Sequence, residues 1–301
     1  MALTKGFITI ATGKEQYYKI AKNLLLSYRF TTKEPLPFTI LCDTENEYTA
    51  EFDEARIFPK PTRSYLDKLN MFDLLPYDIN IFIDADCLAF SDINRLFDLF
   101  ENADDFCCYG RVLPLDDKTG WFEYDNLNAD LQKQIEYVVG LHGGIYYIRK
   151  TQKAKKVLDD AKAFTKNYAD YKFKGKFETP GDEPVVALSM AVNGCKPIPH
   201  DFSSLICWWE HENLFDLDIT NKTAFCKPLN IKTDIVHWGT RFTKSIPYCR
   251  EMAALELNLK GADPKEIKKS NKYYDKLLKK QKANQFKARV VNKIKRTING
   301  G

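Results

Sequence analysis

The sequence predicts an α/β fold in which a mostly parallel, Rossmann-like central sheet carries helices on both faces. Short apolar segments rich in β-branched and aromatic residues alternate with segments whose apolar residues recur at helical spacing, and this alternation is typical of parallel sheets. One apolar segment runs directly into two aspartates that are one residue apart, Asp84 and Asp86. The chain has 301 residues, of which 44% are hydrophobic and 29% charged, and this composition suits one large globular domain with an added tail.

The N-terminal part of the chain supplies most of the parallel strands that we expect. Each is a short apolar run bounded by polar or turn-forming residues, and these runs lie at residues 6–12, 38–42, 56–58 and 81–83. Helices are expected where apolar residues recur every three or four positions, at residues 16–28, 65–75 and 91–100. The last of these helices begins after Ser91 and Asp92, residue types that commonly cap a helix.

The rest of the chain continues the alternation. Strands are expected at residues 106–109, 145–148 and 235–237, and helices at residues 151–168 and 182–192. We expect a tight turn at Gly143 and Gly144, from which the following strand re-enters the sheet. The last helix follows Gly181 and is expected to stop at Asn193-Gly194.

The pair Asp84 and Asp86 lies at the C-terminal end of the strand expected at residues 81–83. Ligands of open α/β sheets bind at this end of the strands. Two carboxylates so close together repel each other unless a cation lies between them. The pair therefore indicates a divalent metal site, and a metal in such a place usually holds phosphate. Asp-x-Asp alone is a weak motif, because it also occurs as a solvated pair at a strand end.

Further blocks strengthen the signal because of their order along the chain. They are Asp67–Phe72, Asn80–Phe90, Ser91–Phe97, Gly143-Gly144, Gly181-Asp182-Glu183 and His237-Trp238-Gly239. This ordered set resembles the GT-A glycosyltransferases, in particular glycosyltransferase family 8, which includes glycogenin and bacterial lipopolysaccharide galactosyl- and glucosyltransferases. The resemblance implies a GT-A catalytic domain over residues 1–250, followed by a basic helical tail over residues 251–301. It also implies an enzyme that uses a nucleotide sugar.

The resemblance also implies roles for the matching positions. Asp84 and Asp86 would hold a metal ion together with His237, and Lys68 would contact the donor sugar or its phosphate. Asp182 and Glu183 would act at the reaction centre. Further positions would bind the nucleotide sugar together with Lys68, Asp84 and Asp86, and these are Thr9, Ala11, Thr12, Tyr17, Ala85, His142, Gly143, Gly144, Gly239 and Lys244.

The predicted metal ligands and the family resemblance together define the expected chemistry. Two carboxylates and one imidazole favour Mn²⁺, with Mg²⁺ as the alternative. A UDP-sugar as donor, a glycan or glycolipid as acceptor, and retention of the anomeric configuration are implied by the resemblance. The chain departs from the family at Glu183, where the family often has glutamine. It also departs after His237, where Gly239 follows by two residues and either Arg241 or Lys244 could meet the diphosphate.

Each of these residues also has a structural interpretation. His237 could be a core histidine, Asp182 the N-cap of its helix, Lys68 part of a solvated helix face and Tyr17 a core residue. Two other functions also remain open. A phosphatase of the haloacid-dehalogenase type would use Asp84 as nucleophile, and an inert protein of the same fold would only bind the nucleotide sugar.

The C-terminal tail is strongly basic. Residues 265–301 hold 13 of the 45 Lys and Arg residues but 2 of the 41 Asp and Glu residues, so the rest of the chain is net acidic. Apolar residues recur about every four positions in this tail, which favours contact with an anionic membrane over a packed helix or a disordered segment. Nucleic acid is not expected as a partner, because the tail has few aromatic residues and no RNA-binding motif.

We expect the protein in the cytoplasm, with the tail on the membrane face. The sequence shows no signal peptide and no apolar stretch long enough to span a bilayer. Its eight cysteines contain no C-x-x-C pair, and we interpret them as small core residues.

Overall fold

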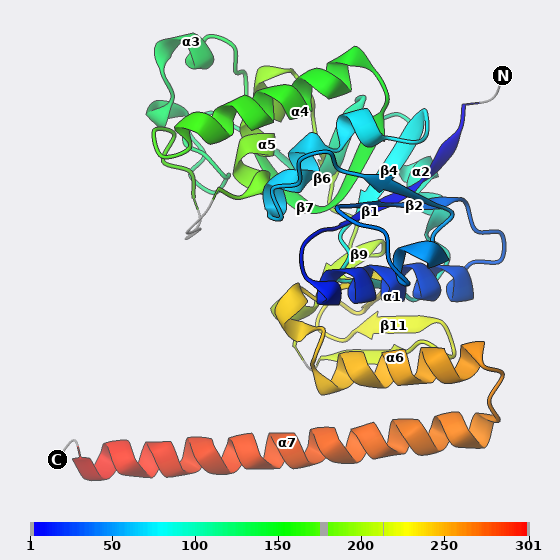
Figure 1. The fold of residues 1–301 in the computed structure, drawn as a ribbon. Coiled ribbons are helices and arrows are strands. Elements are labelled where there is room, and N and C mark those ends of the chain that lie inside the picture. Colours follow the sequence, from blue (N-terminus) through cyan, green and yellow to red (C-terminus); the bar gives the residue numbers. More distant parts are fainter. Residues whose placement is uncertain (1–2, 175–179, 213, 300–301) are drawn as a thin grey trace.

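The computed structural model of the protein describes residues 3–174, 180–212 and 214–299, with side chains described as far as residue 287. Its central element is a seven-stranded sheet (Figure 1). In chain order the strands are β1 (Lys5–Ala11), β2 (Phe38–Cys42), β3 (Glu54–Ile57), β4 (Ile79–Ile83), β6 (Phe106–Leu113), β7 (Val138–Arg149) and β8 (Ile198–Pro199).

The spatial order of the strands is β3-β2-β1-β4-β7-β6-β8. The first four strands of this order are parallel to one another. Strand β7 is antiparallel to both of its neighbours, and β8 is parallel to β6. The sheet is therefore mostly parallel, which confirms the predicted fold class.

Helices cover both faces of the sheet, as predicted. The α-helices are α1 (Glu15–Thr31), α2 (Leu96–Leu99), α3 (Ala129–Gln132), α4 (Gln152–Phe164), α5 (Asp182–Val192), α6 (Ile246–Leu259) and α7 (Pro264–Asn299). Successive strand residues point to opposite faces, so Phe7 and Ile81 pack with α1 and α2, whereas Ile8 and Phe82 pack on the side of α4 and α5. Figure 1 shows α4 and α5 on one side of the sheet and α1 on the other.

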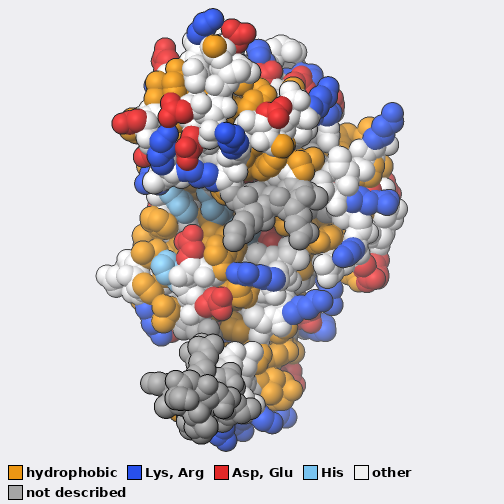
Figure 2. All heavy atoms as spheres, turned by 90° about the vertical axis from the view of Figure 1, so that its left-hand side faces the viewer, with side chains coloured by type: hydrophobic (Ala, Val, Ile, Leu, Met, Phe, Trp, Pro, Cys, Tyr) orange, Lys and Arg blue, Asp and Glu red, His pale blue; other side chains and the backbone are white. Residues whose placement is uncertain are grey.

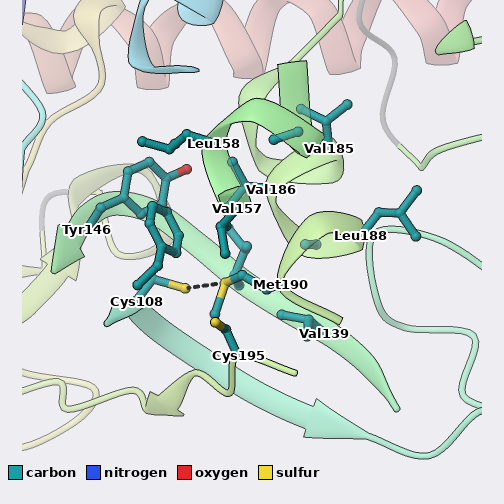
Figure 3. Close-up of a cluster of buried hydrophobic side chains, with 14 of the residues drawn as sticks. Cys108, Val139, Tyr146, Val157, Leu158, Val185, Val186, Leu188, Met190 and Cys195 are labelled. Carbon is teal, nitrogen blue, oxygen red and sulfur yellow. Dashed lines mark hydrogen bonds between the residues drawn. The ribbon is translucent and has the colours of Figure 1, made fainter. Parts of the chain in front are cut away.

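The core between the sheet and the helices α4 and α5 is tightly packed (Figure 3). Tyr146 of β7 and Cys108 of β6 meet Val157 of α4 and Met190 of α5, with Cys108 Sγ 3.6 Å from Met190 Sδ. Thiols serve here as small apolar side chains. All eight cysteines are free and seven of them are buried, in agreement with the predicted structural role.

Two small sheets lie beyond α1. One consists of β5 (Cys87–Ala89), β9 (Leu205–Cys207) and β13 (Ile235–His237), and the other of β10 (Phe215–Asp218), β11 (Thr223–Cys226) and β12 (Ile231–Lys232). Strand β13 lies between β5 and β9, and its last residue, His237, is opposite Cys87 on one side and Cys207 on the other. This register brings a residue from late in the chain next to Asp86.

The prediction of a helix at residues 65–75 is wrong. Two 3-10 turns, Tyr65–Asn70 and Phe72–Leu74, occupy these positions. The buried side chain of Asp67 accepts a hydrogen bond from the backbone N–H of Arg63 at 3.0 Å, which ties the segment back onto the loop before it. This bond accompanies the tighter 3-10 conformation that the segment adopts in place of an α-helix.

The helix expected at residues 91–100 is also shorter than predicted. A 3-10 turn comes first, capped by the side chain of Asp92, and α2 follows it. The remaining 3-10 turns of the described residues are Thr49–Glu51, Tyr124–Asn126, Thr165–Asn167, Trp208–Glu210 and Thr240–Phe242.

The prediction of a tight turn at Gly143 and Gly144 is wrong as well. Both glycines lie within β7, which continues through them from Val138 to Arg149. The pairing of β6 with β7 shifts register at this point, so the strand bulges. The glycines are needed there for space: a Cβ on Gly143 would lie 2.8 Å from Glu183 Cγ, and one on Gly144 would lie 2.7 Å from His142 Cε1.

The two C-terminal helices form a pair beside the small sheets (Figure 1). Helix α6 crosses residue 250, so the boundary expected there falls inside a helix. Ile267 anchors the start of α7 in the core, but every described side chain from Lys279 onward is exposed, including Phe286 at 69%. The side chains of residues 288–299, part of the predicted amphipathic pattern, lie outside the described residues. Within the described part of the chain, no helix combines the length and the apolarity that crossing a membrane requires.

Candidate functional site

The turn that links β4 to β5 carries Asp84 and Asp86. The backbone N–H of Cys87 donates to Asp84 O at 3.1 Å and closes the turn. The N–H of Trp238 donates to Asp86 O at 3.0 Å, which ties the turn to the end of β13. The Asp84 N–H donates to the carbonyl of Gly144 at 3.0 Å, which ties it to the bulge of β7. Two elements far apart in sequence, β7 and β13, therefore help to fix the position of the two aspartates.

His237 completes a cluster with these two aspartates. Its Nε2 lies 2.9 Å from Asp86 Oδ1 and 3.7 Å from Asp84 Oδ2. Thr240 Oγ1 donates to the other oxygen of Asp86 at 2.9 Å. The imidazole nitrogen of His237 thus lies near one carboxylate oxygen of each aspartate at the carboxyl end of β4. This donor set fits a divalent cation of the Mn²⁺ or Mg²⁺ class.

The charges of this cluster influence one another. Burial raises the pKa of Asp84 above its ordinary value, although Lys68 and His237 act against it. Burial also acts to raise the pKa of Asp86, but the imidazole of His237 outweighs it, so this pKa lies below its ordinary value. Burial acts to lower the pKa of His237, but Asp86 outweighs it and the pKa is raised. Asp86 and His237 therefore stabilise each other in their charged forms.

Lys68 is a buried cation between two acids, not a solvated lysine on a helix face. Its Nζ lies 2.9 Å from Asp84 Oδ1 and 3.1 Å from Asp182 Oδ2, and it donates to the carbonyl of Gly143 at 3.2 Å. The residue is 8% exposed. Burial acts to lower the pKa of Lys68, but Asp182 and Asp84 outweigh it, so this pKa lies above its ordinary value and the side chain carries its charge. The cation compensates the acids of the site.

Asp182 and Glu183 begin helix α5. The N-cap is Gly181, so the alternative in which Asp182 caps its own helix is wrong. The carboxylate of Asp182 instead accepts a hydrogen bond from Tyr146 OH at 2.8 Å, in addition to its ion pair. Glu183 Oε1 accepts from the backbone N–H of Gly143 at 2.7 Å. Burial, with the nearby charge of Asp182, raises the pKa of Glu183 to about 7.

This raised pKa predicts a pH-dependent effect of Glu183→Gln on stability. The unfolded chain ionises Glu183 near its ordinary pKa of 4.5 and the folded chain near 7, so folded stability is lost as pH rises through this window. We expect the variant to be more stable than the wild type at pH 8, by at most ~3 kcal/mol, and to match it at pH 4. Chemical denaturation at both pH values measures this, with the exposed Glu47→Gln as control. An equal effect at the two pH values would contradict it.

The spacing of Gly143 against Glu183 supports a second prediction. We expect Gly143→Ala to destabilise the protein by about 1–3 kcal/mol, because the new methyl group would lie 2.8 Å from Glu183 Cγ and 3.0 Å from Tyr146 OH. Gly140→Ala, in the same strand, is the matched control, because its nearest neighbour is the end of the Leu113 side chain at 3.2 Å. Thermal unfolding of both variants checks this, and equal losses would speak against a specific clash.

A cavity of about 300 Å³ adjoins the aspartates and Lys68. Of the predicted donor-binding residues it is lined by Thr12, Tyr17, Lys68, Asp84, Ala85 and Asp86. The sequence reasoning missed its other lining residues, which are Ile10, Ile20, Arg63, Ser64, Tyr65, Phe82 and Thr240. Tyr17 is half-buried at the wall, so its role is not only that of a core residue.

Two predicted residues of β1 do not line the cavity. Thr9 is fully buried and donates to the carbonyl of Ile83 at 2.8 Å, and Ala11 packs in the core with α1. Side chains alternate along a strand, so Ile10 and Thr12 point to the cavity, whereas Thr9 and Ala11 point away from it. The prediction that Thr9 and Ala11 line the cavity is therefore wrong by one position along the strand.

The loop before residue 65 had no signal in the sequence. Asp67 is buried and accepts a hydrogen bond from Thr12 Oγ1 at 2.7 Å, which draws this loop against the end of β1. Arg63 has a positive φ of 56° and its Nε donates to Asp43 at 2.8 Å. The pairing joins segments that are far apart in the sequence, so no local pattern predicts it.

The segment after His237 divides between two cavities. Gly239 has a φ of +68° and packs against Trp209, where a Cβ would lie 3.1 Å from the indole. Thr240 lines both cavities, whereas Lys244 lines the second, which has a volume of about 400 Å³. The second cavity also contacts α6 and α7 and shares Ile20 with the first. Lys244 therefore lies beside the predicted donor site instead of within its main cavity.

His142 lies on β7 next to the two glycines. Its Nε2 is 2.9 Å from Cys207 Sγ, and its Nδ1 accepts from the N–H of Gly144 at 3.2 Å. Burial lowers the pKa of His142 well below its usual range, so the ring is neutral. The contact with Cys207 has no counterpart in the sequence reasoning. Figure 2 shows a face of the molecule on which histidine and acidic side chains are exposed.

Comparison with known proteins identifies the fold. The sequence matches no protein-family model and no curated protein. Among solved structures it is similar to the galactosyltransferase LgtC in complex with donor and acceptor sugar analogues, with 10% identity over 88% of this chain and 99% of LgtC and a TM-score of 0.51. Two others are mouse xyloside xylosyltransferase 1 (13% identity, 80% of this chain and 99% of the other, TM-score 0.46) and the glycosyltransferase GlyE of Streptococcus pneumoniae (13%, 78% and 55%, TM-score 0.44). The likeness to LgtC shows that this chain has the GT-A glycosyltransferase fold that its sequence predicts.

Proposed function

We propose that the protein is a metal-dependent glycosyltransferase that moves a hexose from a UDP-sugar to a glycan or a lipid-linked acceptor, with retention of the anomeric configuration. The observation that carries this proposal is the convergence of Asp84, Asp86 and His237 beside a cavity of about 300 Å³. That arrangement lies at the carboxyl edge of a parallel sheet, where such folds bind nucleotides. The fold, shared with LgtC, agrees with it.

Asp84, Asp86 and His237 are the residues that would hold the cation, Mn²⁺ or alternatively Mg²⁺. A bound divalent cation supplies charge neutralisation for the diphosphate leaving group. Thr240, which donates to Asp86 Oδ2, orients that carboxylate. The UDP-hexose donor is proposed from the resemblance to family 8, since no residue of the cavity identifies the base.

The buried charges behind the cavity have separate tasks in this proposal. Lys68 lines the cavity and can donate to a phosphate or sugar oxygen, while Asp84 and Asp182 hold its ammonium group in place. The carboxylates of Asp182 and Glu183 can accept hydrogen bonds from sugar hydroxyls and stabilise positive charge that develops at the anomeric carbon. Glu183 is in turn oriented by the N–H of Gly143.

The two other functions are less well supported. A haloacid-dehalogenase-type phosphatase would need Asp84 free to attack, but both oxygens of Asp84 lie within 3.2 Å of Lys68 Nζ. An inert sugar-nucleotide-binding protein would not need the metal ligands that Asp84, Asp86 and His237 would supply. Neither alternative has an observation of its own in its favour.

Titration calorimetry of the wild-type protein with UDP, GDP and CMP tests the proposal, each with and without Mn²⁺. We expect UDP to bind and its affinity to rise with Mn²⁺, after which a panel of UDP-sugars identifies the donor. Absence of binding for all three nucleotides would refute the proposal, and release of phosphate from an aryl phosphate would then favour the phosphatase.

The C-terminal helix supports a membrane-bound acceptor. The exposed part of α7 is rich in lysine, and its C-terminal end projects on the side toward which β1 runs, the side of the candidate site (Figure 1). Basic helices bind anionic lipid surfaces through charge attraction together with apolar side chains such as the exposed Phe286. We propose that the tail holds the enzyme at the cytoplasmic membrane face, near lipid-linked acceptors.

The tail predicts a charge-dependent affinity for vesicles. We expect replacement of four exposed lysines of α7 by glutamine to weaken binding to vesicles with anionic lipids by about 100-fold or more, since each basic residue contributes about 1 kcal/mol; these are Lys276, Lys279, Lys280 and Lys282. Cosedimentation measures it. The matched control makes the same change at four exposed lysines of the body, Lys33, Lys60, Lys133 and Lys162. Equal weakening in both variants would show that net charge, not the tail, determines binding.

A further inference from the structure

A second group of potential metal ligands lies on the far side of His237 from Asp86. It consists of His142 of β7, Cys207 of β9 and His237 of β13, and one ligand atom from each lies within 4.8 Å of the others. The register of the small sheet places His237 opposite Cys207, and the bulge of β7 brings His142 to the same place. One thiol and two imidazoles form a soft donor set, unlike the carboxylates on the other side.

The Nδ1 atom of His237 has no hydrogen-bond partner. The residue is 7% exposed, and this nitrogen is buried without a hydrogen-bond partner. A Cβ on residue 144 would lie 3.0 Å from this nitrogen and 2.7 Å from His142 Cε1, so Gly144 leaves open the space between the two rings. A buried polar atom without a partner calls for an explanation, and an absent ligand is one.

The hydrogen bonds of the two histidines fix where their protons lie. His237 Nε2 donates to Asp86 Oδ1 at 2.9 Å, so Nδ1, which is buried without a hydrogen-bond partner, is the nitrogen that can bind a second metal once the charged ring gives up its Nδ1 proton. Zinc-binding histidines usually show this arrangement, with one nitrogen on the metal and the other N–H on a carboxylate. His142 Nδ1 accepts from Gly144, so its Nε2 carries the proton and donates to Cys207 Sγ.

We propose that His142, Cys207 and His237 form a second metal site, specific for a thiophilic divalent cation such as Zn²⁺, with water as fourth ligand. Three protein ligands and an open position are a common zinc arrangement. Binding releases the thiol proton of Cys207 and the Nδ1 proton of the charged His237 ring to solvent, and moves the proton of His142 from Nε2 to Nδ1. The second change breaks the 3.2 Å bond from Gly144, and the metal–nitrogen bond replaces it.

Occupation of this site would oppose occupation of the carboxylate site. A metal on Nδ1 of His237 keeps the proton on Nε2, whereas a metal held by Asp84 and Asp86 needs Nε2 without its proton. One imidazole cannot satisfy both metals unless it loses both protons. Zn²⁺ at the soft site would therefore weaken binding of the cation at Asp84 and Asp86. This coupling rests on the proposed function, but the soft site itself does not.

Cobalt substitution tests the soft site directly. A thiolate bound to Co²⁺ gives a near-ultraviolet charge-transfer band, which carboxylate and imidazole ligands do not. We expect the wild-type protein to show this band at one equivalent of Co²⁺. The band should disappear in Cys207→Ser and persist in Cys87→Ser, the same change at the buried cysteine on the other side of His237. Absence of the band in the wild type, or its loss in Cys87→Ser alone, would overturn the assignment.

A second variant covers the case in which Cys207→Ser does not fold. His142→Gln changes a partly exposed ring, and we expect Co²⁺ to bind it at least ~10-fold more weakly than the wild type. An unchanged affinity would overturn the assignment.

The coupling has a separate readout in calorimetry of Mn²⁺ and UDP on the wild-type protein, with and without one equivalent of Zn²⁺. We expect Zn²⁺ to weaken the binding of Mn²⁺ and UDP. If the cobalt band forms but Zn²⁺ has no effect on UDP, the soft site stands and the coupling fails. If UDP does not bind at all, the proposed function fails while the cobalt result remains.

Discussion

Asp86→Asn is expected to remove the dependence of UDP binding on Mn²⁺ and to lower sugar transfer by at least ~100-fold. The substitution keeps the size of the side chain but removes the negative charge that attracts both the metal and the imidazole of His237, 2.9 Å away. Thr240 can still donate to the remaining carbonyl oxygen, so the turn between β4 and β5 should keep its shape. Calorimetry with UDP, with and without Mn²⁺, gives the first readout and transfer from a UDP-sugar the second.

The matched control for this variant is Asp130→Asn. Asp130 lies on α3 with its side chain 89% exposed, in an ion pair with Lys133 one helical turn away. It undergoes the same chemical change far from the site, so we expect wild-type binding. If Asp86→Asn still bound UDP in an Mn²⁺-dependent way, Asp86 would not be a ligand of the metal and the proposed site would fail.

Lys68→Met is expected to cost about 3–5 kcal/mol of folding free energy and to abolish transfer. The variant keeps the apolar stem but leaves Asp84 and Asp182, now 2.9 and 3.1 Å from the ammonium group, without their cation. Uncompensated buried charge is among the most destabilising changes a core can undergo. Chemical denaturation measures the loss, and Lys162→Met, an exposed lysine of α4, serves as control.

The pH dependence of this loss separates charge from packing. Burial raises the pKa of Asp84 in the folded state, and Lys68 is the strongest influence that lowers it. Without Lys68 the pKa rises further above its value in the unfolded chain, so the folded variant loses stability as pH rises through the range between them. We therefore expect a larger penalty at pH 8 than at pH 4. A penalty independent of pH would show that the lysine stem, not the ammonium group, is what the core requires.

The sequence predicts the aspartate pair well because its signal is local. An apolar strand followed by Asp84 and Asp86 places both at the carboxyl end of the sheet, whatever the remaining chain does. The resemblance to family 8, not the spacing of residues, predicts a metal-ligand role for His237. About 150 residues separate it from Asp86, and the pairing of β13 with β5 that joins them depends on the packing of the second sheet.

The errors have a common physical cause. Gly143 and Gly144 predict a turn because glycine is common in turns, but here the missing side chains make room for Glu183 and His142. The apolar spacing around Asp67 predicts a helix, but the segment forms 3-10 turns and its buried carboxylate bonds to the preceding loop. Both outcomes depend on neighbours that are distant in sequence.

The sequence by itself determined the α/β class, most strands of the central sheet, most of the long helices, the aspartate pair and the basic tail. These follow from periodicity and composition, which act over a few residues. The tertiary structure decided the ion pairs of Lys68, the inward direction of Asp182, the raised pKa of Glu183 and the grouping of His142 with Cys207 and His237. Each of these depends on which strands lie side by side and in which register, and that is set by the packing of the whole chain.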